Sequence, residues 1–577
     1  MKKLVIVLLL TAGSIFSQTQ FRLNVNNINL PMDNKGILAA VNIPDPNPVI
    51  SGAGGKFGGH IFLFSGGFLL AGYANDTLWA NGVASASLIK DYLPGTVNNE
   101  PTDPKNIIYL VKKNDAAFGQ SWQDWINAVE LGADFYDGNN DGVYNPTDLN
   151  GNNIWDSSED KPAIMGDQMT WCVYNDEVPA DQRRFNTVTP KGIQIQQTVL
   201  AYASAQAPLG NTIFIRYRLI NTGTIASKLD SVIFAIYTDP DLGSALDDLI
   251  GCDTLLNSGF VYNDGPDGEY GSNPPAFFMK YLQGPISYIP GETFIDNNSN
   301  GYYENGIDTP LDTAYNRKGN LFNTQSYPGA KNLGITSYTM LVGGDPTLMD
   351  PSNFMEAANY LNGLTRTGAI LNPCIFTYGT VNGGVNCTAV NPYLWFSGDP
   401  VSNIGWIETL PGDLRNIVST GKFTLEVNKP IDLWVAYVVG QGSNALNSIS
   451  VARNYTQDAQ TYFNANFTNG TISDVDDNDY TLPEKFSLFQ NYPNPFNPST
   501  TIRYSIPNVT LSGVEGSRVQ LRIYDILGNE VATLVNEYKP AGMYNLQFTM
   551  NNLASGIYFY RLTAGSFVQT KKMILLK

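Results

Sequence analysis

The sequence is poor in the residues on which most enzymes depend. It contains one histidine and four cysteines in 577 residues, and only 15% of its residues are charged. A single histidine, His60, cannot supply a Ser-His-Asp or Cys-His site or a metal site built from several histidines, and its Gly-rich apolar surroundings favour a structural role. No Cys-x-x-Cys motif supports zinc or redox chemistry. We therefore expect no catalytic residues and no organic cofactor, and the sequence favours a protein that is not an enzyme.

Positive charge is also scarce. Lys and Arg total 34 against 52 Asp and Glu, which leaves a net charge of -18. Phosphate groups would be repelled by such a chain, so we expect no nucleic-acid partner, and anionic membrane surfaces are disfavoured for the same reason. After the first residues, no apolar run approaches the ~20 residues that a spanning helix needs. We therefore expect no membrane span in the mature chain.

The chain is rich in the residues of strands and turns. Aromatic residues make up 12% of it, and it holds 54 glycines and 33 prolines. This composition predicts a mainly β protein, with β-sandwich domains, long loops and a few short helices. The chain is also longer than one ordinary hydrophobic core accommodates, which predicts several domains.

The first residues have the pattern of an export signal. Lys2 and Lys3 precede an apolar run, LVIVLLL, and small residues follow it up to Ser17. This arrangement predicts a signal peptide over residues 1–17, with cleavage after Ser17. The apolar run is too short for a transmembrane anchor, which is the alternative. The protein is therefore expected outside the inner membrane.

Changes in composition and residue pattern divide the rest of the chain into regions. Helical patterns near residues 121–132, 351–363 and 448–467 interrupt alternating, strand-like segments. An acidic, Pro-containing segment then precedes a last compact set of strands. We predict an N-terminal β-rich region at 18–168, a β-sandwich ectodomain with inserted loops and a terminal helix at 169–470, an acidic linker at 471–483 and a C-terminal domain at 484–577.

The last domain carries the run Asn-Tyr-Pro-Asn-Pro-Phe-Asn-Pro at residues 491–498, then VQLRIYDILGNEVATLV and a terminal KKMILLK. These residues resemble the type A sorting domain of the type IX (Por) secretion system, over residues 482–577. The resemblance implies an immunoglobulin-like sandwich that engages the type IX machinery. It also implies translocation across the outer membrane and a location that is secreted or on the outer cell surface. The remainder resembles uncharacterised ectodomains of other cargo of this system, and this resemblance implies an architecture but says nothing about an activity.

Carboxylates and amides are concentrated between Asp137 and Asp160. Calcium binds six to eight oxygens, and an EF-hand loop supplies them from positions 1, 3, 5, 7, 9 and 12, with Gly at position 6. A loop that starts at Asp137 has Gly142 at position 6. Its expected ligands are Asp137, Asn139, Asp141, the Val143 carbonyl, Asn145 and Asp148.

Two further loops fit the same spacing. The second begins at Asp148, which would also end the first, and has Asn153 where Gly is preferred; its expected ligands are Asp148, Asn150, Asn152, Asp156 and Glu159. The third has its last carboxylate one residue late, and its expected ligands are Asp296, Asn298, Asn300, Glu304 and Asp308. Such tandem loops resemble thrombospondin type 3 and dockerin-like calcium loops, which predicts Ca2+ in a structural role.

The alternative is that these segments are solvated turns, because Asp, Asn and Gly dominate turns in any case. A further acidic cluster follows a predicted strand and either binds a cation or is a turn with exposed carboxylates. Its members are Asp239, Asp241, Asp247, Asp248 and Asp253.

The four cysteines allow three pairings. Cys374 and Cys387 flank a short loop and could pair, which would leave Cys172 and Cys252 for each other. Buried free thiols are the alternative, and the sequence does not choose between the two.

Two functions remain in view from the sequence. The first is a secreted or cell-surface protein, stabilised by calcium, that has a structural or adhesive role and contacts extracellular glycans or surface proteins. The alternative is a secreted polysaccharide-binding protein or a glycoside hydrolase that uses a carboxylate pair. A groove lined by Trp and Tyr would favour the alternative.

Overall fold

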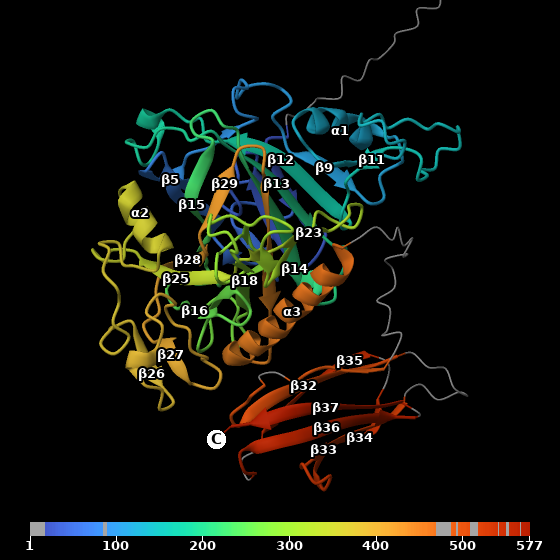
Figure 1. Ribbon diagram of the computed structural model, residues 1–577, viewed down its shortest axis with the longest axis vertical. Helices are drawn as coiled ribbons and strands as arrows, with labels where there is room; N and C mark the ends of the chain where they lie inside the picture. The colour runs from blue at the N-terminus through green and yellow to red at the C-terminus, as the bar shows by residue number, and fades with distance from the viewer. Residues whose placement is uncertain are drawn as a thin grey trace, which may run out of the picture. The chain divides into compact units, whose positions relative to one another are not determined.

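The structure is a computed structural model, and it describes residues 18–84, 89–468, 486–491, 494–507, 517–539, 542–549, 553–565 and 567–576 (Figure 1). The chain divides into two compact units, Met1–Ile472 and Ser473–Lys577. The predicted signal peptide at 1–17 and the predicted linker at 471–483 lie outside the described residues.

Two antiparallel sheets form the body of the larger unit. The first has nine strands, in the order β16 (Leu249–Asp253), β17 (Ser258–Tyr262), β18 (Ala276–Gln283), β30 (Ile431–Gly440), β14 (Thr212–Asn221), β13 (Ile193–Ala201), β12 (Gln168–Asn175) and β8 (Leu93–Pro94), with β9 (Tyr109–Lys112) also paired to β12. The second has seven strands, in the order β25 (Ile335–Val342), β28 (Leu414–Thr420), β15 (Lys228–Asp239), β5 (Ser65–Ala74), β6 (Thr77–Ala84) and β7 (Ile89–Lys90), with β29 (Phe423–Glu426) also paired to β15.

The alternation of side chains in β14 explains how the two sheets meet. Ile213, Ile215 and Tyr217 are buried in the same core as Phe234 of β15 and Phe68 of β5. The ring centroids of Tyr217 and Phe234 lie 5.2 Å apart, and those of Phe68 and Tyr217 lie 5.6 Å apart. Because alternate residues of a strand point to one face, this face of the nine-stranded sheet packs on the seven-stranded sheet. The predicted mainly β fold is confirmed.

The other face of the nine-stranded sheet is covered by a helix. Trp434 and Val438 of β30 belong to a second core, which also contains Phe463 from α3 (Ala445–Asn466). The ring centroids of Trp434 and Phe463 lie 5.6 Å apart. Figure 1 shows α3, in orange, beside this sheet, where it contacts β18 and β30. Burial on both faces is the reason that β30 has a continuous apolar sequence.

The three helices expected from the sequence are present as α1 (Gln120–Glu130), α2 (Phe354–Leu361) and α3. The helix α1 begins slightly before the expected residue 121: Gly119 is its N-cap residue, without a side-chain cap, and Ser121 lies inside the helix. The helix α3 starts earlier than expected because the Asn444 side chain accepts a hydrogen bond from the Asn447 backbone N–H. None of the described helices has the length and apolarity to cross a membrane.

The expected division near residue 168 is not a division between folding units. The strands β5 and β6 precede it, yet β5 pairs with β15, which follows it. The strands β8 and β9 also precede it, and both pair with β12. The two regions predicted at 18–168 and 169–470 therefore form one sandwich, because each contributes strands to both sheets.

Smaller elements surround this sandwich. A four-stranded sheet contains β1 (Gln20–Leu23), β2 (Ile28–Asp33), β3 (Gly55–Phe57) and β4 (His60–Leu63). Two-stranded pairs are formed by β19 (Ile286–Ser287) with β24 (Lys331–Asn332), β22 (Thr313–Asn316) with β23 (Gln325–Pro328), and β26 (Gly379–Asn382) with β27 (Gly405–Glu408).

A disulfide joins Cys374 to Cys387 in the larger unit, ahead of β27. The other two cysteines, Cys172 and Cys252, are buried and unpaired. Each alternative that the sequence left open therefore holds for one pair of cysteines. Cys374 and Cys387 form a disulfide, whereas Cys172 and Cys252 are buried free thiols. Burial raises the pKa of both thiols, so they stay protonated at neutral pH.

The C-terminal unit has a core of its own between two sheets. One sheet has the order β31 (Ser487–Leu488), β32 (Ser499–Ile506) and β35 (Gly542–Thr549). The other has the order β34 (Glu530–Lys539), β33 (Ser517–Tyr524), β36 (Gly556–Ala564) and β37 (Phe567–Leu575). Ile502 of the first sheet and Leu521, Tyr560 and Met573 of the second are fully buried together. The unit is a small antiparallel sandwich, as the sequence predicted.

Two described residues of the Asn- and Pro-rich run, Asn494 and Phe496, contact the last strand of this sandwich. Its Phe496 is buried, donates its backbone N–H to the Ile574 carbonyl and accepts one from Leu576. The Asn494 side chain accepts the Ile574 N–H at 2.8 Å. These two residues therefore hold the last strand, β37, in place.

Candidate functional site: three oxygen-rich loops

The predicted calcium loops are excursions between pairs of two-residue strands. The first two loops lie between β10 (Phe135–Tyr136) and β11 (Lys161–Pro162), beside α1 (Figure 1). The third lies between β20 (Phe294–Ile295) and β21 (Thr309–Pro310). Each strand pair matches a Phe with a Pro, so the two sites have the same base.

The first aspartate of each loop bonds to the same backbone positions. The Asp137 carboxylate accepts the N–H of Asp141 at 3.2 Å and of Gly142 at 2.8 Å, at positions 5 and 6. The other loops repeat this: Asp148 accepts from Asn152 and Asn153, and Asp296 from Asn300 and Gly301. The chain is thereby bent around one carboxylate in all three loops.

The side-chain oxygens at positions 3 and 5 each accept the backbone N–H of the residue two positions later, in all three loops. The Asn139 Oδ1 accepts the Asp141 N–H at 2.9 Å, and the Asp141 Oδ1 accepts the Val143 N–H at 2.7 Å. The matching acceptors are Asn150 and Asn152 in the second loop, and Asn298 and Asn300 in the third. Each oxygen uses one lone pair in such a bond and keeps another for a ligand.

Backbone conformation also repeats, at positions 4 and 6. Both positions have positive φ in every loop: Asn140 and Gly142, Gly151 and Asn153, Ser299 and Gly301. The Asn153 that stands in place of the preferred Gly has φ 59°. Asn is one of the few residues that tolerate this region, so the departure from the pattern does not change the bend.

A carboxylate closes each loop by accepting the N–H groups of positions 2 and 9. In the third loop Asp308 does so, from Asn297 at 2.9 Å and from Glu304 at 2.7 Å. In the second loop Glu159 does so, from Leu149 at 2.7 Å and from Asp156 at 3.1 Å.

The first loop differs from the sequence prediction at this position. Asp148 was expected to close it, but Asp160 accepts the N–H of Gly138 at 3.0 Å and of Asn145 at 2.8 Å. The hydrogen bonds of the Asp148 carboxylate run to residues of the second loop. Those from Asn153, Gly151 and Asn152 lower the pKa of Asp148.

A signal for Asp160 is present in the sequence. The first site opens with Phe135-Tyr136-Asp137 and closes with Asp160-Lys161-Pro162, and the third opens with Phe294-Ile295-Asp296 and closes with Asp308-Thr309-Pro310. The shared pattern is Phe-x-Asp followed by Asp-x-Pro, across loops of different length. It also explains why Asp308 comes one residue late: its place is set by the strand that follows.

Burial separates the closing carboxylates from the loop tips. Asp160 and Glu159 are each 2% exposed and Asp308 is 6% exposed. At position 7 the apolar side chains of Val143, Ile154 and Tyr302 are at least 62% exposed. A calcium ligand at position 7 is a backbone carbonyl, so it places no demand on the side chain.

The donors that the loops bring together are carboxylate, amide and main-chain oxygens. Within the described parts of the chain, no group of three or more His, Cys, Asp or Glu side chains forms a metal cluster. Acidic side chains alone therefore do not build a site here. An ion would depend on the Asn side chains and carbonyls as well, a donor set that suits hard ions rather than zinc.

The second acidic cluster divides in the structure. Asp239 pairs with Arg415, and Asp253 pairs with Arg453 at 2.8 Å. Burial, followed by the charge of Asp239, raises the pKa of Asp241 to about 7. Burial also raises the pKa values of Asp247 and Asp248.

The aromatic residues divide by type: the tryptophans are largely buried, whereas Tyr73, Tyr288, Tyr302 and Tyr315 are each more than 40% exposed. All tryptophans except Trp155 are buried. Trp155 is partly buried, and the Lys161 ammonium lies 3.6 Å from the centroid of its ring. The Nδ1 atom of His60 lies 3.3 Å from the Glu269 carboxylate, and its ring packs against Tyr270.

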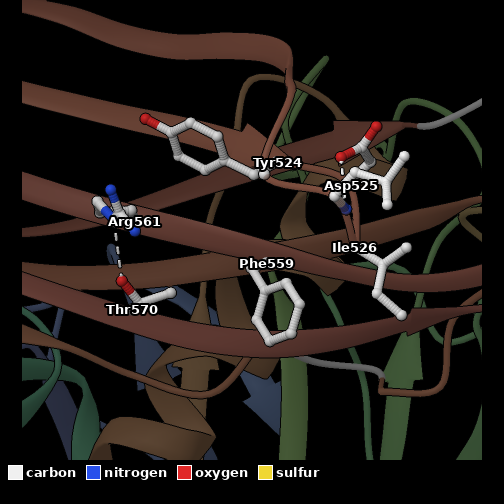
Figure 2. Close-up of a pocket in the computed structure, with 8 residues that line it drawn as sticks. Tyr524, Asp525, Ile526, Phe559, Arg561 and Thr570 are labelled. Atoms are coloured by element: carbon white, nitrogen blue, oxygen red, sulfur yellow. Dashed lines mark hydrogen bonds between the residues drawn. The ribbon is translucent and has the colours of Figure 1, made fainter.

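The C-terminal unit has a pocket of about 370 Å³ beside the turn between β33 and β34. Figure 2 shows Arg561, whose Nε donates to the Thr570 hydroxyl at 3.1 Å, together with Tyr524 and Phe559 on the pocket wall. Asp525 shapes the turn by accepting the backbone N–H of Asn529 at 2.8 Å.

Comparison with known proteins identifies this unit. Residues 490–576 match the family described as the secretion system C-terminal sorting domain. An uncharacterized Saccharomyces cerevisiae protein, YOL114C, is 36% identical over 74 residues, which are 12% of this chain and 35% of that protein. The chain thus spans about a third of that relative.

Among solved structures, the adhesin domain of Epf from Streptococcus pyogenes aligns with 9% identity and a TM-score of 0.14. The alignment covers 70% of this chain and 89% of that domain, and at this TM-score it has no bearing on function. The match to the sorting domain, in contrast, does indicate where the protein acts. The chain carries a C-terminal sorting domain and is thus a cargo of the type IX secretion system, delivered to the outer surface of the cell.

Proposed function

We propose that the larger unit is a calcium-stabilised β-sandwich with a structural or adhesive role at the cell surface. The observation that carries this proposal is the repetition of one hydrogen-bond pattern in three loops. Each loop has an aspartate at position 1, acceptors at positions 3 and 5 and a buried closing carboxylate. Solvated acidic turns have no physical reason to share all of these features.

The proposed ligands follow from this pattern. In the first loop they are Asp137, Asn139, Asp141, the Val143 carbonyl, Asn145 through a water, and Asp160. In the second they are Asp148, Asn150, Asn152, the Ile154 carbonyl, Asp156 and Glu159. In the third they are Asp296, Asn298, Asn300, the Tyr302 carbonyl, Glu304 and Asp308. Each set approaches the six to eight oxygens that calcium takes.

Charge supports the same proposal. Buried carboxylates are costly unless they are compensated, and Asp160, Glu159 and Asp308 accept backbone N–H bonds from their own loops. A divalent cation would add positive charge beside them. The overall charge of -18 also favours cation binding outside the cell, where calcium is abundant enough for millimolar sites.

The role we assign to calcium is to stiffen the loops. The segments 137–160 and 296–308 extend from two-residue strand pairs. Side chains such as Tyr144, whose hydroxyl donates to the Trp122 carbonyl, attach the first segment to the core. At ten times its dissociation constant, one bound ion adds about 1.4 kcal/mol to the free energy of unfolding, so three ions add about 4 kcal/mol. This is a large part of the 5–15 kcal/mol that stabilises typical domains.

A structural or adhesive role fits the remaining features. The sorting domain delivers the chain to the surface, where glycans and surface proteins are the available partners. The burial of nearly all tryptophans weakens the polysaccharide alternative, which depended on aromatic side chains lining a groove. A glycan array with the calcium-loaded protein tests that alternative directly.

Calcium-dependent unfolding of the mature chain tests the metal proposal. We expect millimolar calcium to raise the unfolding temperature, and the double variant Asp137→Asn/Asp141→Asn to lose part of that rise. Asp525→Asn is the matched control, because Asp525 forms a similar turn in the C-terminal unit without the other ligands. If a chelator leaves the unfolding temperature of the intact protein unchanged, the calcium proposal is wrong.

A further inference from the structure

Two cations share one face of the small four-stranded sheet. Arg22 of β1 lies opposite Pro31 of β2, and Lys56 of β3 lies opposite Asn29 of β2. Pro31 and Asn29 are two residues apart and therefore point to the same face of the strand. Arg22, Asn29 and Lys56 thus form a row across three neighbouring strands.

Both cations are buried beneath the segment 43–54. Arg22 is 7% exposed and Lys56 is 9% exposed. The Arg22 Nη2 donates to the Gly52 carbonyl, and the Lys56 Nζ donates to the Ser51 carbonyl. The segment is itself tied down by a bridge between Ile43 and Gly52.

Several polar atoms in this row have no partner. The Arg22 Nε and Nη1 are buried and donate to nothing, and the Asn29 Oδ1 is buried and accepts from nothing. Native proteins pair nearly all such atoms, because an unmet buried donor or acceptor keeps its full desolvation cost. These atoms therefore point to a ligand.

The row carries two positive charges without an ion pair. Among the described residues, neither Arg22 nor Lys56 forms a salt bridge. The charge of Asp45, whose Oδ1 accepts the Asn47 N–H at 2.7 Å, partly offsets the charge of Arg22. Burial lowers the pKa of Arg22, and burial together with the charge of Arg22 lowers the pKa of Lys56. A bound anion would relieve both effects.

We propose that Arg22, Asn29 and Lys56 form a binding site for a small oxyanion that also carries a hydroxyl group. The anionic oxygens would accept from the unpaired Arg22 N–H groups and from the Lys56 ammonium. The hydroxyl would donate to the Asn29 Oδ1. Hydrogen phosphate and α-hydroxy carboxylates, such as sugar acids, have both groups, whereas sulfate and acetate lack the hydroxyl.

The segment that covers the site lies at the protein surface. Residues 46–49 are exposed, and no heavy atom lies within 4 Å of the position that a Gly52 side chain would occupy. A ligand therefore needs to displace one surface segment and not the sandwich. This site lies on other elements than the calcium loops, so the oxyanion proposal does not depend on the calcium proposal.

Titration calorimetry of the mature chain tests the proposal, without added calcium so that phosphate stays in solution. We expect saturable binding of inorganic phosphate or of glycolate, and at least tenfold weaker binding of sulfate and acetate. Binding of phosphate alone would identify phosphate as the source of the oxyanion, and binding of glycolate alone would identify a hydroxy acid. Lys56→Gln should weaken the binding at least tenfold, and Lys56→Arg should retain it.

Lys280→Gln is the matched control. Lys280 is also buried, at 4% exposure, and its ammonium also donates to a backbone carbonyl, that of Leu256. This variant should lose stability as Lys56→Gln does, but keep the affinity for the oxyanion. If the wild-type chain binds none of the four anions, or if Lys56→Gln and Lys280→Gln change the affinity equally, the site does not exist.

Discussion

The identity of the residue that closes the first loop leads to the sharpest prediction. The carboxylate of Asp160 is buried and accepts N–H groups from Gly138 and Asn145, on opposite sides of the loop. Asp160→Asn puts an NH2 group against one of these donors. It therefore removes one charge-assisted hydrogen bond, which costs about 1.5–3 kcal/mol without calcium.

In calcium the same substitution should cost more. If the first loop loses its ion, the variant also loses about 1.4 kcal/mol of ligand stabilisation at ten times the dissociation constant. The total loss then rises to roughly 3–4.5 kcal/mol. Urea unfolding followed by tryptophan fluorescence, without calcium and at ten times the dissociation constant, measures both quantities.

Counting the bound ions separates the two assignments of Asp148. If Asp148 belonged to two loops, as the spacing alone predicted, Asp148→Asn would remove two ions. Because its carboxylate bonds only within the second loop, we expect it to remove one. Asp160→Asn should also remove one, from the first loop. A calorimetric count in which Asp148→Asn loses two ions, or Asp160→Asn loses none, would refute this reasoning.

Three further predictions concern the sandwich. Asp241→Asn should stabilise the larger unit at pH 8 but not at pH 4: the folded carboxyl has its pKa raised to about 7, so its contribution favours folding below about pH 4 and is lost as pH rises towards 7; equal pH profiles for variant and wild type in thermal unfolding would contradict this. Reducing Cys374–Cys387, which closes a loop of sequence separation 13, should cost about 3 kcal/mol and speed proteolysis of that loop, with Cys252→Ser as the control that leaves the disulfide intact. Arg216→Met should cost about 3–5 kcal/mol, because it leaves Asp432, 1% exposed at its side chain, buried without its partner; an unfolding free energy within 1 kcal/mol of wild type would show that the pair is dispensable.

Much of the local structure could be predicted from the sequence. The alternation Ile213, Ile215, Tyr217 predicted a strand with one buried face, and the structure has it in β14. The ends of helices were less certain: Ser121 is a good capping residue, yet α1 begins before it. Capping preferences are worth about 1 kcal/mol, and the packing of Trp122 and Trp125 in the core outweighs them.

Some residues of the candidate site could also be predicted from the sequence, and others could not. The positions of Asp137, Asn139 and Asp141 follow from spacing, because bonds between neighbours along the chain form each bend. Asp160 did not follow from spacing, since a second loop separates it from the loop that it closes. The two neighbouring cations Arg22 and Lys56 could not be predicted from the sequence either, because they come together only when three strands pair.

The sequence by itself determined the destination of the protein, its β character and the three acidic bends, since these depend on short, contiguous patterns that local chemistry enforces. Only the tertiary structure decided that residues on both sides of position 168 form one sandwich, and which thiols pair. These depend on contacts between residues far apart in the chain, and such contacts are chosen by the packing of the whole core rather than by any neighbouring residue.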